Sequence, residues 1–333
     1  MVRIMRAETL NLDLKGVYMN NSICSYESFA REMLEAVRCR FEDDADCSVE
    51  MTSVTKNNQV RSDTIVVRGT GRTCAPVIRV RDLYELFLQG AACSSLADEI
   101  ADIYYKSAGQ FEDLTSDRLL DFDSIKDRLI IKVINGDHNT QLLEDVPCIR
   151  KLDLALTFRI MAESYDHMQG SILVDNDLMN MWQVTPEILF KEAAGNMEQL
   201  WHSSILPLDE MIKGLTCGDD MEQDQLHTPF LVLTNDRFCY GAAALFCTDL
   251  IRDFARCADS DFYILPSSIH EILLVPTRED MDACQLQEMV SSVNREAVGE
   301  DEILSDHVYL YERKNDRLSY ADTQSDSFCI RME

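Results

Sequence analysis

Hydrophobic positions along the chain follow two periods, and each period predicts a different kind of element. Apolar residues spaced three to four apart predict amphipathic helices, and residues 25–41 are a clear case because Phe29, Met33 and Val37 share one face. The same spacing predicts helices at 79–91, 94–108, 185–201, 247–258 and 281–297. Strict alternation predicts strands. It is clearest from Leu152 to Ile160, with residues 171–174 as the expected pairing partner.

Turn-forming residues between short apolar runs predict antiparallel hairpins. These turns are expected at Asn57-Asn58 within 47–69, at Asn235-Asp236 within 229–246, and at Asn315-Asp316 within 307–320. Short amide and carboxylate side chains tolerate the backbone of tight turns. Residues 262–266 and 271–275 form a further predicted hairpin, and 127–136 reads as a strand that ends in turn residues.

Hairpins that alternate with helices predict an α+β fold, in which helices cover antiparallel sheets. We expect two lobes: an N-terminal α+β lobe over residues 1–146, and a C-terminal α+β lobe over 147–320 with repeated hairpin–helix units. The boundary is placed near Pro147, although no Gly/Ser/Pro linker marks it. Residues 321–333 are expected to fray, as chain ends often do.

The acidic composition limits the classes of partner. With 31 basic and 59 acidic residues the net charge is 31 − 59 = −28, and the acids are spread along the chain. A field of this sign repels phosphate backbones, so nucleic-acid binding is not expected. A lesser alternative is a DNA mimic, whose carboxylates imitate a row of phosphates.

The sequence also predicts a cytoplasmic location. No apolar run approaches the ~20 residues of a membrane helix, and the first residues lack the apolar core of a signal peptide, so no membrane association is expected. The twelve cysteines contain no C-x-x-C pair, which disfavours a zinc ribbon or a redox motif. Reduced thiols are expected.

The stretch "LPSSIHE" holds the most concentrated polar chemistry. Its candidate catalytic residues are Ser267, Ser268, His270 and Glu271. A zinc-protease helix needs a second histidine after H-E-x-x, and a serine-hydrolase elbow needs glycines around the serine; both are missing. The favoured interpretation is a structural turn in which the hydroxyls bond the backbone. The alternative is a binding or catalytic site.

Other motifs do not reach the threshold for a cofactor or metal prediction. "GTGRTC" from residue 69 fails the dinucleotide fingerprint at Cys74. Asp137 and His138 lie together after a predicted strand, but two ligands are too few for a metal site. We therefore predict no cofactor and no metal.

Three stretches, "VLTNDRFCYGAAALF", "DFYILPSSIHEILLVP" and "LSDHVYLYERKNDRL", resemble an uncharacterised domain-of-unknown-function family of anaerobic gut bacteria. "ILVDNDLMNMWQVTPEILFKEAAGNM" fits the same family, and "LPSSIHE" is its most specific string. "DLALTFRIMAES" and the helix that follows are also similar to a second uncharacterised family of cytosolic proteins. The resemblance implies a bacterial, intracellular protein and brings no known activity.

Two functions from different classes stay open. The first is a non-catalytic cytosolic interaction or regulatory protein that meets a protein partner. The second is a hydrolase or metal-dependent enzyme that uses His270 and Glu271. The missing phosphate loop, metal spacing and nucleophile elbow favour the first. Oligomeric state is not predictable from these patterns.

Overall fold

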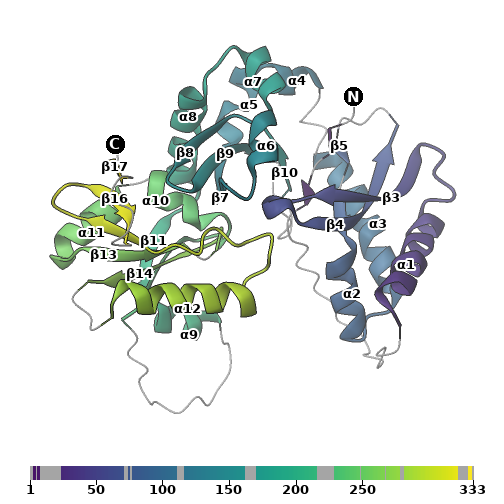
Figure 1. Cartoon of the computed structure of the whole chain (residues 1–333). Coiled ribbons are helices and arrows are strands. Elements are labelled where there is room, and N and C mark those ends of the chain that lie inside the picture. The colour runs from purple at the N-terminus through teal and green to yellow at the C-terminus, as the bar shows by residue number, and fades with distance from the viewer. Residues whose placement is uncertain are drawn as a thin grey trace. The chain divides into compact units, whose positions relative to one another are not determined.

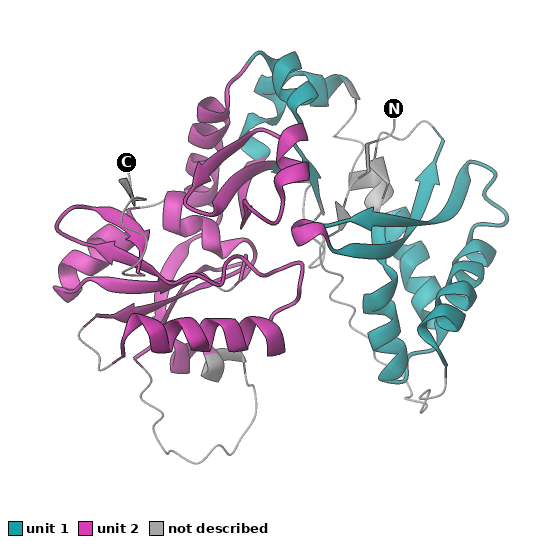
Figure 2. Cartoon of the chain, viewed as in Figure 1, with its two compact units in different colours: residues 1–56, 60–128, 159–183 teal, residues 57–59, 129–158, 184–333 magenta. Residues whose placement is uncertain are grey.

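The structure is a computed structural model of the chain (Figure 1). It describes residues 3–4, 6–7, 24–70, 74–75, 77–110, 116–161, 170–215, 229–247, 249–266, 268–277, 281–321 and 329–331. Helices and antiparallel sheets make up an α+β fold, as the sequence predicts. Figure 2 divides the chain into two compact units, residues 1–56, 60–128 and 159–183 (unit 1) and residues 57–59, 129–158 and 184–333 (unit 2).

Pro147 lies inside unit 2. The division into one lobe over residues 1–146 and another over residues 147–320 stays a prediction.

Unit 1 is built around a short antiparallel sheet and its helices. Its elements are β1 (Arg3–Ile4), β2 (Arg6–Ala7), α1 (Tyr26–Arg40), β3 (Cys47–Thr55), β4 (Arg61–Gly69), β5 (Cys74–Ala75), β6 (Val77–Arg79), α2 (Val80–Leu88), α3 (Cys93–Gln110), α4 (Ser116–Leu120), α5 (Phe122–Ile125), η2 (Lys126–Arg128), β10 (Gly170–Leu173) and α7 (Asn176–Trp182). Strands pair in the order β3-β4-β6, and β1 pairs with β5 in parallel.

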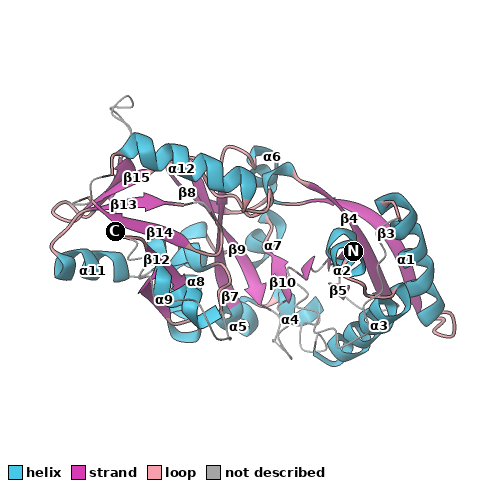
Figure 3. Ribbon diagram, turned by 90° about the horizontal axis from the view of Figure 1, so that it is seen from below, coloured by secondary structure: helices cyan, strands magenta, loops and turns pink. Residues whose placement is uncertain are grey.

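The apolar face predicted for α1 packs in the core of unit 1. Phe29, Met33 and Val37 are buried and belong to one cluster with Ile65 of β4 and Leu83 of α2. Strands β3 and β4 form the predicted hairpin around Asn57-Asn58, with Thr55 opposite Arg61. Figure 3 shows α1, α2 and α3 beside this hairpin.

Strand β9 (Leu154–Met161) begins in unit 2 and ends in unit 1. Its first residues pair antiparallel with β8, and its last residues, Arg159 to Met161, pair antiparallel with β10 as predicted. All its residues but the last are buried, so both faces are covered. The alternation that predicted this strand is therefore not an alternation between buried and exposed residues. The polar residues of β9 are buried as well, and they find partners inside the protein: the Thr157 hydroxyl, for example, donates to the Lys132 carbonyl at 2.9 Å.

Unit 2 contains a long antiparallel sheet. Among the described residues its strand order is β11-β12-β14-β13-β15-β16-β17. The elements of unit 2, apart from β9, are η1 (Asn57–Gln59), β7 (Leu129–Asn135), α6 (Thr140–Asp145), β8 (Cys148–Lys151), α8 (Pro186–Leu200), β11 (Ser203–Pro207), α9 (Leu208–Leu215), β12 (Leu231–Asn235), η3 (Gly241–Ala243), α10 (Ala244–Cys247), α11 (Leu250–Ala258), β13 (Phe262–Leu265), β14 (Ile272–Pro276), α12 (Ala283–Glu296), β15 (Tyr309–Glu312), β16 (Arg317–Tyr320) and β17 (Cys329–Arg331).

Helices cover both faces of this sheet. Leu265 and Val275 pack with Leu286 and Val290 of α12 in one apolar cluster. On the opposite face, the ring of Phe262 lies 5.6 Å from that of Phe254 on α11. Phe262 and Leu265 of β13 thus contact different helices, because their side chains point to opposite faces of the strand.

The hairpins of the C-terminal half are partly as predicted. β13 and β14 pair antiparallel, and so do β15 and β16. Residues 229–246 do not form a hairpin: β12 pairs with β11 and β14, and the chain is helical in η3 and α10. The run "AAAL" explains the error, since alanine favours helix over strand.

Within the tail, Cys329–Arg331 form β17, which pairs with β16. Residues 322–328 and 332–333 lie outside the described residues, so the fraying of 321–333 stays a prediction.

Candidate functional site

The sequence-predicted residues lie in the turn between β13 and β14. The structure brings Ser268, His270 and Glu271 together there, while Ser267 lies outside the described residues. Segment 302–305 braces the turn: the Ile269 N–H donates to the Glu302 carbonyl at 2.9 Å, and the Ser305 N–H donates to the Pro266 carbonyl at 3.0 Å. The turn is therefore held by backbone hydrogen bonds from a distant part of the chain.

Ser268 is nearly inaccessible and already bonded. Its side chain and backbone are buried, with 4% of the residue exposed. Its hydroxyl oxygen accepts the His270 N–H at 3.0 Å. A hydroxyl in this position fixes the turn, as short polar side chains commonly do.

His270 uses both ring nitrogens within the fold. Nδ1 accepts the Tyr240 N–H at 3.3 Å, and Nε2 lies 3.6 Å from Glu302 Oε1. A neutral imidazole has one lone pair for accepting a hydrogen bond. When Nδ1 accepts, the proton is on Nε2 and faces Glu302. His270 then has no free lone pair with which to act as a general base.

The backbone of the turn is packed as tightly as its side chains. The His270 carbonyl accepts the Thr234 hydroxyl at 3.0 Å. A Cβ atom at Gly241 would lie 2.3 Å from the same carbonyl oxygen. Glycine is required at 241 because of this approach.

Glu271 is half-buried and does not join a metal-binding group. Burial raises the pKa of its carboxyl, while His270 and the Ser268 hydroxyl oppose that shift and Glu302 adds to it. Within the described ranges, no three His, Cys, Asp or Glu residues are placed to hold a metal ion.

A second polar cluster, around Asp153 before β9, escaped the sequence analysis. The buried Asp153 carboxylate accepts hydroxyl hydrogen bonds from Tyr309 at 2.5 Å, Tyr320 at 3.3 Å and Ser305 at 2.6 Å. Desolvation, followed by the charge of Asp153, raises the pKa of Tyr309 well above its ordinary value. No local motif could reveal this cluster, because its partners lie more than 150 residues along the chain.

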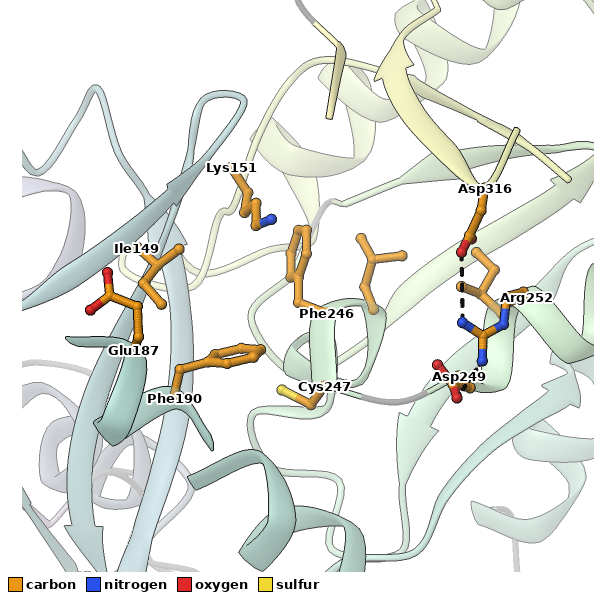
Figure 4. A pocket seen from close by; sticks show the side chains of 11 residues that line it. Ile149, Lys151, Glu187, Phe190, Phe246, Cys247, Asp249, Arg252 and Asp316 are labelled. Atoms are coloured by element: carbon orange, nitrogen blue, oxygen red, sulfur yellow. Dashed lines mark ion pairs between the residues drawn. The ribbon is translucent and has the colours of Figure 1, made fainter. Parts of the chain in front are cut away.

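A pocket of about 390 Å³ lies in unit 2, between β8 and the start of α8 on one side and α10, α11 and the β15–β16 turn on the other (Figure 4). Its volume falls within the usual range of ligand pockets, about 300–1,000 Å³. Five of its lining side chains are apolar: Ile149, Phe190, Leu245, Phe246 and Ile251.

The charged side chains of the pocket form one fixed cluster and one looser group. The Arg252 guanidinium pairs with Asp249, lies 3.7 Å from Asp316 Oδ2, and lies 3.9 Å from Asp253 Oδ1. Asp316 is itself anchored, because the Tyr311 hydroxyl donates to its Oδ1 at 2.6 Å.

Lys151 and Glu187 line the opposite side of the pocket (Figure 4). Lys151 makes no ion pair with the described residues.

The pocket also contains a thiol, Cys247, at the end of α10. Burial raises the pKa of this thiol, so it is protonated at neutral pH. The thiolate is the nucleophilic form of cysteine. This environment therefore disfavours covalent catalysis by Cys247. Nine cysteines in the described part of the chain, Cys247 among them, are free thiols.

Comparisons with known proteins identify a family for this chain, and they assign no activity to it. A family model described as a family of unknown function (DUF5688) matches residues 26–313. No match was found among curated proteins or among solved structures. No helix in the described part of the chain is long and apolar enough to cross a bilayer. Since the family model covers most of its residues, the chain belongs to the family of unknown function DUF5688.

Proposed function

We propose that this protein is a non-catalytic binding or regulatory protein, and that the pocket lined by Phe190, Phe246 and Arg252 recognises a protein partner. The observation that carries the proposal is the pocket itself, which combines apolar lining side chains with a charged cluster anchored by Tyr311. Binding sites commonly join an apolar lining to a few placed polar groups. Helices α8 and α11 and strand β8 supply these groups from regular secondary structure, which favours a preformed site.

The His270 turn supports a non-catalytic function. Its serine is buried and its imidazole lone pair is occupied by Tyr240. A nucleophile and base need to reach a substrate and each other. The arrangement of Ser268 and His270 serves the backbone of the turn instead.

A hydrolase or metal-dependent enzyme is the second candidate, and the 3.6 Å approach of His270 Nε2 to Glu302 is the observation that favours it. A histidine oriented by a carboxylate is a common part of catalytic sites. In an enzyme of this kind, hydrolysis of a broad ester and peptide panel would be lost in Glu302→Gln with the fold intact. We expect neither the wild type nor Glu302→Gln to hydrolyse any substrate of the panel.

The experiment for the binding proposal is affinity capture from cells of the source organism. Three baits are compared: the wild type, Phe190→Glu in the pocket, and Met181→Glu as a control at an exposed methionine. We expect a protein that the wild type and Met181→Glu retain and that Phe190→Glu loses. Equal capture by all three, with melting curves that confirm folding, would contradict the proposal.

The proposal also covers the origin and the cellular location of the protein. We infer a bacterial, cytoplasmic protein from the resemblance and the composition. The DNA-mimic alternative rests on the net charge of −28, and competition with duplex DNA for a DNA-binding protein tests it directly. We expect neither such competition nor direct DNA binding.

A further inference from the structure

This inference rests on the proposed function and specifies the chemistry of the partner. We propose that the pocket binds a segment of a partner protein in which a large apolar side chain lies next to a lysine or arginine. The apolar side chain occupies the centre of the pocket, and the cation pairs with the carboxylates around Arg252.

The walls of the pocket favour a large apolar side chain. Phe190 and Phe246 face the pocket from α8 and α10, and Ile149 stands beside them on β8 (Figure 4). A large apolar side chain that enters this space loses roughly 150–250 Å² of water-exposed surface if it is aromatic. Side chains of this kind, seated in a pocket, provide most of the binding energy in protein interfaces.

One end of the pocket carries an excess of negative charge. Asp249, Asp253 and Asp316 lie around the guanidinium of Arg252, and Asp253 Oδ1 also lies 3.8 Å from Arg256 Nη1. Three carboxylates against two cations leave one negative charge in excess at this end. A cation supplied by the partner complements that excess.

Accessibility agrees with this assignment. The side chain of Asp249 is 68% exposed, so its carboxylate can be reached from solvent. Asp316 is held in place by Tyr311, which lowers the ordering cost of forming a new ion pair.

The rest of the lining does not reverse the preference for a cation. Lys151 and Glu187 carry opposite charges and cancel at the other side of the pocket. The net charge of −28 acts in the same direction, because a field of that sign steers cationic segments toward the protein. An anionic segment would meet repulsion both at long range and at the Asp249–Asp316 end.

Fluorescent peptides test the assignment by anisotropy at physiological salt. The probe is a nine-residue Gly/Ser peptide with a central phenylalanine between two lysines. Two reference peptides replace the phenylalanine by alanine, or the lysines by glutamates. We expect the probe to bind about tenfold tighter than the alanine peptide of equal charge, which corresponds to about 1.4 kcal/mol, and no measurable binding of the glutamate peptide.

Two protein variants locate the binding. Asp249→Asn removes a pocket charge, and Glu27→Gln removes the same charge from an exposed position on α1. We expect the probe to bind Asp249→Asn several-fold more weakly, and to bind Glu27→Gln as it binds the wild type. Phe190→Ala should bring the probe down to the affinity of the alanine peptide.

Equal binding of the probe and the alanine peptide would overturn the proposal, and so would equal losses in Asp249→Asn and Glu27→Gln. The proposed function fails separately, if Phe190→Glu captures the same proteins as the wild type. A third outcome separates the two proposals. If Phe190→Glu loses a captured protein but the wild type does not prefer the cationic probe over the reference peptides, only the assignment of partner chemistry is overturned.

Discussion

The His270 turn and the pocket both combine polar and apolar side chains in unit 2, yet their polar groups have opposite environments. In the turn, the Ser268 hydroxyl accepts the backbone N–H of His270, and the His270 ring accepts the backbone N–H of Tyr240. In the pocket, the carboxylate of Asp249 pairs with Arg252 and is still largely exposed. The first arrangement consumes hydrogen-bonding capacity within the fold, and the second leaves charge for a partner.

This difference separates stability from recognition. A buried polar group with all its bonds made contributes to the native state, and its removal leaves a partner unsatisfied. An exposed ion pair contributes little to stability, since water screens it. Substitutions in the turn should therefore lower stability, and substitutions in the pocket should lower binding.

The largest loss of stability is expected at the Asp153 cluster. Like the His270 turn, it uses its polar groups within the fold, and its central carboxylate is buried. Asp153→Ala leaves the hydroxyls of Tyr309 and Ser305 without their acceptor, so the free energy of unfolding should fall by about 3 kcal/mol or more. Urea unfolding measures it. Asp137→Ala, at a 72% exposed carboxylate, is the control and should change stability by less than about 0.5 kcal/mol. Similar values for the two variants would contradict the role given to the cluster.

The next effect concerns alkaline pH. Burial and Asp153 raise the pKa of Tyr309, and the same causes raise that of Tyr320. An unfolded tyrosine ionises near pH ~10. Between that pH and the higher folded pKa the unfolded state holds fewer protons, so stability falls as pH rises. Below pH ~10 the contribution is fully present. Urea titrations at pH 8 to 11 should give a shallower decline for Tyr309→Phe than for the wild type; an unchanged slope counts against this assignment.

A smaller loss is expected in the His270 turn. Ser268→Ala and His270→Ala each remove one hydrogen bond to the backbone and should lower stability by about 1–2 kcal/mol. His202→Ala, at an 80% exposed side chain, is the matched control and should have almost no effect. If both turn variants melt at or above the wild-type temperature, the turn is held at a cost to stability, as functional sites often are.

The smallest effect is expected in the pocket. Asp249→Asn weakens an ion pair at an exposed carboxylate, so stability should change by less than about 0.5 kcal/mol even though binding of the cationic probe is impaired. Melting and anisotropy on the same sample make the comparison. A loss of stability as large as that of the turn variants would erase the contrast between the two regions.

Local pattern was sufficient where neighbours in sequence decide the structure. Alternation and turn residues identified the pairs β13–β14 and β15–β16, and the 3.6-residue period identified α12. They failed at 241–247, where a run of small residues has no alternation, and at β11, whose sequence Ser-Ser-Ile-Leu-Pro carries little strand signal.

The candidate sites were less predictable, because their parts meet only in the folded chain. His270 was selected from the sequence, but Tyr240, which occupies its Nδ1, lies 30 residues earlier. The pocket joins Ile149 of β8 to Asp316 of the β15–β16 turn. No spacing rule covers such distances, so charge and hydropathy alone could not reveal the site.

The interleaving of the two units has a consequence for synthesis on the ribosome. Unit 1 includes residues 159–183, which come after the first segments of unit 2. Its chain is therefore incomplete when residue 128 emerges. At typical elongation rates, about 5–20 residues per second, a further 55 residues (183 − 128) take roughly 3–11 s. Within that interval, the edge of β9 that pairs with β10 has no partner from the synthesis of Met161 until Gly170–Leu173 follow. An unpaired strand edge is prone to association. We expect slow translation through 129–183 to favour aggregation of the nascent chain, so the codons of this stretch influence the yield of native protein.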